Sequence, residues 1–229
     1  MANAEDSNTT SVWLNPLRIW SFDDVGTERG DTGSVLRDLC RDYTEDPLQG
    51  MRERYIRLTE CDCSLFAVPA DKRILDKIVW PLHSAKRCYC MADHLGCIAL
   101  CGVVCEMAVI FIYDLLAKSP ACKTLAQDQR ELFRKRKYEN LGQEKRIANL
   151  RLLSLVNPSL LDQADVVRKL RREYLHFLEK SHKHLAQDAV SAYAAAFAVV
   201  SALVALPIAN SRLVVPNHLD SYLRAKRLL

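Results

Sequence analysis

The chain has 229 residues, of which 49% are hydrophobic and 26% charged, a length and composition typical of one globular domain with its own core. These fractions exclude an intrinsically disordered chain, and only seven glycines and eight prolines exclude a collagen-like or low-complexity one. So few turn-forming residues also disfavour an all-β fold. The expected fold class is therefore all-α.

Charge is divided unevenly along the chain. Residues 1–62 hold seven basic and thirteen acidic side chains, whereas residues 63–229 hold 25 basic and 15 acidic ones, so the formal net charges are −6 and +10. We divide the chain accordingly into an acidic, partly ordered N-terminal extension, 1–62, and a basic α-helical domain, 63–229. A basic domain favours an anionic partner such as RNA, although a well-solvated helical surface has the same composition.

Apolar periodicity and turn signals predict a series of helices. They are expected at residues 33–43, 48–58, 71–118 with a new helix starting near Pro81, 124–140, 142–154, 159–180, 186–206 and 217–229. Asp71 is the expected N-cap of the long helical region, and the pair Asn157 and Pro158 marks a turn before a later helix. No pair of strands joined by a hairpin turn is recognisable.

The nine cysteines do not resemble a disulfide framework. Their number is odd, the chain starts with a polar, acidic segment rather than a signal peptide, and Cys97, Cys101 and Cys105 share one helical stripe, where cysteines behave as small hydrophobic residues. We expect reduced thiols and a cytoplasmic location.

Motifs for metals and nucleotides are missing from the sequence. The pairs Cys61/Cys63 and Cys88/Cys90 each have one residue between the two cysteines, whereas the paired cysteines of a structural zinc site usually have two to four residues between them. There is no P-loop, no dinucleotide-binding glycine motif, no nucleophile elbow and no paired-histidine zinc motif. We therefore expect no metal and no cofactor.

Two apolar stretches raise the question of a membrane span. Residues 95–113 carry one charged side chain, that of Glu106, and residues 189–209 carry none. The second stretch is rich in alanine and serine, which suits the central helix of a soluble bundle. We expect no membrane span.

Glu106 lies in an otherwise apolar helix and therefore needs a cationic partner. Candidates occur in residues 166–177, where Arg172 and His176 are four residues apart and share a helix face, with Arg171 slightly further round. Guanidinium groups bind phosphate and imidazole transfers protons near neutral pH, which are the tasks of RNA cleavage by 2′-hydroxyl attack. A solvated basic helix face is the alternative explanation of the same spacing.

The order of these segments resembles the HEPN superfamily of helical domains. The resemblance covers residues 70–206: an early helix with Glu106, the helix at 142–154, the turn at Asn157, the run Arg171 to His176, and an alanine-rich helix beginning at Asp188. It implies a helical bundle and a homodimer in which two Arg/His motifs face each other. It also implies a metal-independent ribonuclease, in many cases a toxin or defence effector neutralised by an antitoxin or partner protein.

On that resemblance Arg171 is the motif arginine, His176 the motif histidine, and Glu106 the acidic residue that braces the motif. Arg172 stands where the family usually has Asn, Asp or His, and we assign it a supporting role. Other HEPN-like domains are inactive, so a non-catalytic helical module that binds RNA or a protein partner is the second hypothesis. Tyr174 and Phe177, beside the motif, are expected to pack in the core rather than to stack on bases.

Contacts with the RNA backbone are expected from further basic side chains. The candidates are Arg130, Arg134, Lys135, Arg136, Lys137 and Arg168.

Overall fold

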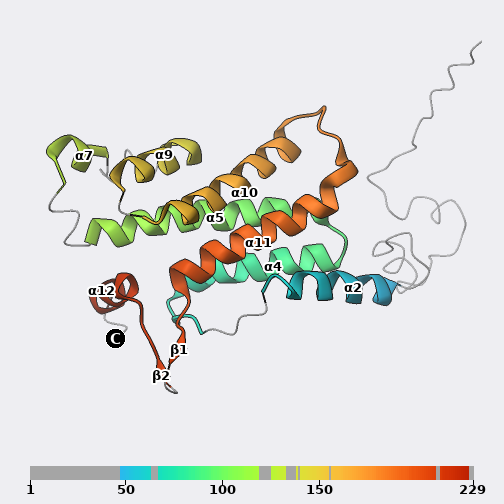
Figure 1. The fold of residues 1–229 in the computed structure, drawn as a ribbon, viewed down its shortest axis with the longest axis horizontal. Helices are drawn as coiled ribbons and strands as arrows, with labels where there is room; N and C mark the ends of the chain where they lie inside the picture. The colour runs from blue at the N-terminus through green and yellow to red at the C-terminus, as the bar shows by residue number, and fades with distance from the viewer. Residues whose placement is uncertain are drawn as a thin grey trace, which may run out of the picture. The chain divides into compact units, whose positions relative to one another are not determined.

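The computed structural model describes residues 47–62, 67–118, 125–132, 138, 140–154, 156–209 and 212–226. The fold of these residues is all-α, as predicted, with one very short strand pair near the C-terminus (Figure 1).

The helices and strands are α2 (Pro47–Thr59), α3 (Lys72–Ile74), the π-helical turn η1 (Leu75–Val79), α4 (Trp80–Cys90), α5 (His94–Lys118), α7 (Gln127–Leu132), α9 (Gln143–Leu153), α10 (Pro158–His176), the 3₁₀ turn η2 (His182–His184), α11 (Leu185–Val204), β1 (Ile208–Ala209), β2 (Arg212–Leu213) and α12 (Asn217–Ala225).

Helix α5 is the centre of the bundle. It packs against α4, α10 and α11, which run beside it in Figure 1, and more lightly against α9 and α12. Its stripe of Cys97, Cys101 and Cys105 is completely buried, as predicted, and all three thiols are free. The facing surface of α11 is rich in buried alanines, including Ala189 and Ala192. Small residues on both sides let the two backbones approach closely, so that the Cys97 thiol lies 3.9 Å from the carbonyl oxygen of Ala189.

Helix α2 belongs to the same compact unit as the bundle. This unit begins at Leu48, so residues 48–62 belong to the helical domain. Arg54 donates to the carbonyl oxygen of Cys90 at 2.8 Å, and Asp62 accepts hydrogen bonds from Lys86 and from the Tyr193 hydroxyl. The helix expected at 33–43 lies outside the described residues.

The region from Asp71 to Lys118 is interrupted, contrary to the prediction of helix throughout. Asp71 caps its start as predicted, since its carboxylate accepts from the Ile74 amide at 3.0 Å. As predicted, a new helix starts near Pro81, since α4 begins at Trp80 and has this proline in its first turn. Because proline lacks the amide hydrogen that would bond four residues back, the chain passes through the π-helical turn η1 and continues into α4. The chain then turns at residues 91–93, where Ala92 has a φ of 64°.

Two further features differ from the prediction, the end of α10 and a strand pair near the C-terminus. Helix α10 begins after the Asn157 cap, whose side chain accepts from the Ser159 amide at 3.0 Å, but it ends at His176 rather than at residue 180. The chain becomes extended at Phe177, which lets it reverse into η2 and α11. Strands β1 and β2 pair antiparallel and form a short hairpin that the sequence did not reveal.

Two helical segments are long and apolar enough to cross a membrane, namely His94–Leu116 and His182–Val204. Their most apolar windows are 56% and 50% buried inside the bundle. The core helix of a soluble protein has the same length and composition, so these two segments are weak evidence for a membrane protein.

Candidate functional site

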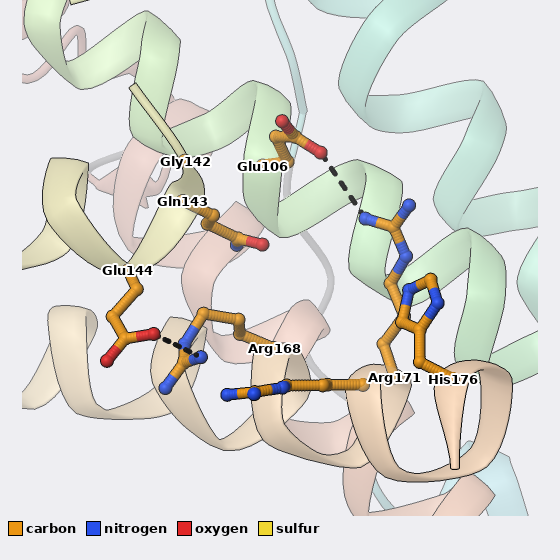
Figure 2. Close-up of a pocket in the computed structure, with 8 residues that line it drawn as sticks. Glu106, Gly142, Gln143, Glu144, Arg168, Arg171 and His176 are labelled. Atoms are coloured by element: carbon orange, nitrogen blue, oxygen red, sulfur yellow. Dashed lines mark hydrogen bonds and ion pairs between the residues drawn. The ribbon is translucent and has the colours of Figure 1, made fainter. Parts of the chain in front are cut away.

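An open cleft of about 450 Å³ lies where α5, α9 and α10 meet. It contains five residues that the sequence singled out and three that it did not (Figure 2). The lining residues are Glu106, Gly142, Gln143, Glu144, Arg168, Arg171, Arg172 and His176. The structure therefore brings Arg171, Arg172, His176, Glu106 and Arg168 into one place, although they come from two helices.

Glu106 holds two arginines, one with each carboxylate oxygen. Its Oε2 lies 3.3 Å from Nη1 of Arg171, the contact drawn in Figure 2, and its Oε1 lies 3.0 Å from Nη1 of Arg146. The Arg146 side chain is 6% exposed and also donates to the carbonyl oxygen of Tyr138 at 3.0 Å. The cationic partner expected for Glu106 is thus confirmed. The second partner, Arg146, was not predicted.

Gly102 makes room for Arg171 on the surface of α5. A methyl group at Gly102 would overlap Cδ of Arg171 and lie 3.1 Å from its Cγ and 3.2 Å from its Nε. The arginine side chain therefore lies flat against the backbone of α5, one helical turn before Glu106. Its Nε is buried without a hydrogen-bond partner among the described residues. The guanidinium is therefore oriented by its packing on Gly102 and by its ion pair with Glu106.

Arg168 lies one turn before Arg171 and is held by other carboxylates. It donates to Asp165 at 2.7 Å and to Glu144 at 3.3 Å, the second contact being visible in Figure 2. Burial alone would raise the pKa of Asp165, but hydrogen bonds from Arg168 and Lys169 outweigh it and lower that pKa. Asp165 is therefore a firm partner, whereas Glu144, 69% exposed, is a weak one.

His176 is the last residue of α10 and is exposed at the rim of the cleft. Its ring lines the same cleft as the side chain of Arg171 (Figure 2). Arg172 is also exposed, and its guanidinium lies 5.4 Å from the centre of the Phe177 ring. Among the described residues Arg172 makes no ion pair, so it is the arginine of this cleft whose charge is least compensated.

The two aromatic residues beside the motif have different environments. Tyr174 is 6% exposed and its hydroxyl donates to Asp188 at 2.6 Å, which confirms the prediction that it packs in the core. Burial, together with this hydrogen bond, raises the pKa of Tyr174 to about 12. The same prediction is wrong for Phe177, which is 42% exposed because the helix ends before it.

Of the other candidates for RNA-backbone contacts, Arg130 belongs to the described residues, and it does not line the cleft. Arg130 is exposed on α7. Arg134, Lys135, Arg136 and Lys137 lie outside the described residues.

Four residues of α9 and its start were not singled out from the sequence: Gly142, Gln143, Glu144 and Arg146. Gln143 points into the space between Glu106 and Arg168 in Figure 2, and its Nε2 is buried without a partner among the described residues. The sequence offered one signal for these residues, namely a predicted helix start without a side chain that could cap it. This start lies shortly before α10, the helix that carries Arg171 and His176. Within the described ranges, no three His, Cys, Asp or Glu side chains are grouped so as to hold a metal ion.

Comparisons with protein-family models, with curated proteins and with solved structures gave no significant match to this chain.

Proposed function

We propose that this protein is a metal-independent endoribonuclease of HEPN type, with Arg171 and His176 as its catalytic residues and Arg172 and Glu106 in support. The observation that carries this proposal is the meeting of three guanidinium groups and one imidazole in a single open cleft. A cleft of about 450 Å³ has the size of a small-ligand site and accommodates a nucleotide of an extended strand.

The reaction that suits these groups is attack of a ribose 2′-oxygen on the adjacent phosphorus. A base removes the 2′-hydroxyl proton, the new O–P bond forms, and the bond to the 5′-oxygen breaks while an acid protonates that oxygen. The products are a 2′,3′-cyclic phosphate and a 5′-hydroxyl end. Arg171 and Arg172 would stabilise the negative charge that builds up on the phosphoryl oxygens, and His176 would exchange the proton.

The number of imidazoles in the cleft favours a homodimer. The reaction needs both a proton acceptor and a proton donor, and His176 is the one histidine among the residues that line the cleft. A second copy of the chain, with its own His176 facing the same phosphate, would supply the second group. Such an enzyme would act on cytoplasmic RNA as a toxin or defence effector, and a partner protein would restrain it.

A non-catalytic binding module is the second candidate. It is favoured by the ion pairs that already compensate Arg171 and Arg168, through Glu106, Asp165 and Glu144. In such a module the arginines would stabilise the contact between α5, α9 and α10. RNA or a protein would then bind without being changed.

Incubation with end-labelled single-stranded RNA in EDTA separates the two candidates. The enzyme should cut the RNA and leave 2′,3′-cyclic phosphate ends, and His176→Ala should abolish the cut. His184→Ala, which removes another exposed histidine in η2, is the matched control and should cut like the wild type. Intact RNA with the wild-type protein, or equal cleavage by His176→Ala, would contradict the proposed function.

A further inference from the structure

Phe177, the residue directly after His176, is a large aromatic side chain that the bundle leaves exposed. Helix α10 ends at His176, and Phe177 continues with extended backbone, at φ −108° and ψ 111°. Phe177 is 42% exposed, whereas Tyr174 on the last turn of α10 is 6% exposed. Single apolar residues are common on protein surfaces, so this exposure alone assigns no role to the ring. The side chain that packs against it points to one.

Arg172 connects the Phe177 ring to the cleft. Its guanidinium carbon lies 5.4 Å from the centre of the ring, which is the distance of a cation–π contact. The same arginine lines the cleft together with Arg171 and His176. Among the described residues Arg172 makes no ion pair, whereas Arg171 is paired with Glu106. The contact with Phe177 therefore positions the Arg172 guanidinium without neutralising its charge.

A phenyl ring and a guanidinium are two kinds of flat side-chain surface on which proteins stack nucleobases. The exposed part of Phe177 offers a π-face, and the charge of Arg172 attracts the phosphates on either side of a base. In a nucleic-acid strand one sugar separates each base from its phosphate. A phosphate bound by Arg171 would therefore bring a neighbouring base to the rim of the cleft, where Arg172 and Phe177 lie.

We propose that Arg172 and Phe177 form a platform on which an unpaired nucleobase stacks, beside the phosphate held by Arg171 and His176. The platform rests on the proposed function for its role, which is to position the strand for the cut. Bases in a duplex are already stacked on their neighbours, so the platform selects RNA that is single-stranded at the cleft. Because every base has a π-face, it selects unpaired bases without reading their sequence.

The test compares two strands that differ in their bases alone. One is a short, fluorescent, single-stranded 2′-deoxy oligonucleotide, which keeps the phosphates and the bases but lacks the attacking hydroxyl. The other is the same strand built with abasic sugars, which keeps the phosphates and loses every base. Fluorescence anisotropy with the full chain gives the two dissociation constants, and their ratio measures the contribution of base stacking. Circular dichroism confirms that each variant is folded.

The wild type should bind the base-bearing strand about fivefold or more tightly than the abasic strand. Phe177→Ala should bring this ratio close to one, and Phe177→Trp, which keeps a flat ring, should preserve it. The matched control is Leu178→Ala, which removes the next apolar side chain, that of a residue 101% exposed but without a flat surface. It should leave the ratio at the wild-type value. Annealing the strand to its complement should remove the difference between Phe177→Ala and the wild type.

A ratio near one for the wild type, or a ratio that Phe177→Ala lowers no more than Leu178→Ala does, would overturn the platform. Equal loss of self-association by both variants in size-exclusion chromatography, with an unchanged ratio, would also overturn it and assign the two side chains to a contact between copies of the chain.

The failure of the platform is distinguishable from that of the proposed function. A protein that binds with the expected ratio but leaves RNA intact keeps the platform and loses the nuclease. EDTA-resistant cleavage by a protein whose ratio is near one keeps the nuclease and loses the platform.

Discussion

Glu106 and Arg146 form an ion pair with an O–N distance of 3.0 Å, in which the arginine side chain is only 6% exposed and the carboxylate is 30% exposed. The buried member of the pair is thus the cation, and it depends on a carboxylate that also serves Arg171. This asymmetry determines which of the two substitutions, at Glu106 or at Arg146, lowers the free energy of unfolding more.

Glu106→Gln should lower the free energy of unfolding by about 2–3 kcal/mol, because it removes the carboxylate charge that pairs with the buried guanidinium of Arg146. Arg146→Met should cost only about 1 kcal/mol, since an apolar side chain of similar length replaces the charge and Glu106 keeps Arg171 as its partner. Urea unfolding followed by circular dichroism measures both values. A larger loss for Arg146→Met than for Glu106→Gln would contradict this account of the pair.

If the protein cleaves RNA as proposed, Gly102→Ala should impair that cleavage more than it impairs folding. The added methyl group overlaps Cδ of Arg171 and forces this flexible side chain away from α5 and from Glu106. Alanine is favoured over glycine inside a helix by about 1 kcal/mol, which offsets the cost to stability. Cleavage assays and urea unfolding on the same preparation separate the two effects.

The control for this substitution is Val103→Ala, which changes the next residue of α5, an exposed side chain that does not line the cleft. It should leave the position of Arg171 and the cleavage rate unchanged. Equal activity of Gly102→Ala and the wild type would show that the cleavage activity does not depend on the packing of Arg171 against α5.

Tyr174 should make folding sensitive to alkaline pH. Burial and donation to Asp188 raise its pKa to about 12 from an ordinary value of 10.0. Because the folded state holds this proton more tightly than the unfolded state, the stabilisation is complete below pH 10 and is lost as the pH rises toward 12. Tyr174→Phe should therefore show a flatter decline of the unfolding free energy between pH 10 and 12. If the unfolding free energy of Tyr174→Phe declines as steeply as that of the wild type, groups other than Tyr174 cause the loss of stability at alkaline pH.

The cysteine stripe of α5 should be inert in the folded protein. Cys97, Cys101 and Cys105 are fully buried, and burial raises the pKa of the Cys105 thiol to about 12. Iodoacetamide should alkylate none of the three under native conditions and all three in urea, whereas the partly buried Cys61 should react in both. Mass spectrometry of tryptic peptides reports each site. Rapid native labelling of Cys101 would mean that α5 and α11 separate readily.

The features that the sequence predicted correctly depend on local chemistry. Asp71 and Asn157 cap helices because their side chains accept from amides a few residues ahead, a contact that needs no distant partner. The cysteine stripe follows from helical periodicity alone. Likewise, a carboxylate in an apolar helix needs a cation, which holds wherever that cation comes from.

The features that it missed depend on tertiary contacts. Nothing local identifies Arg146, 40 residues after Glu106, as the buried partner, because several arginines follow at helical spacing. Gln143 belongs to the cleft only because α9 lies across α10. The turn at Ala92 is an exception, because Asp93, whose carboxylate accepts from the Gly96 amide at 2.7 Å, is a local capping signal that the prediction did not use. The end of α10 at His176 was hidden by a helical pattern that runs past it.

Helix α5 meets a different demand on each of its sides. The side facing α11 needs small residues such as Cys97, and the side facing α10 needs the missing side chain of Gly102 and the charge of Glu106. Larger residues would separate the helices on one side and displace the arginine on the other. These two sides of α5 therefore tolerate few substitutions. On its remaining side, exposed positions such as Val103 are where relatives of this chain would differ.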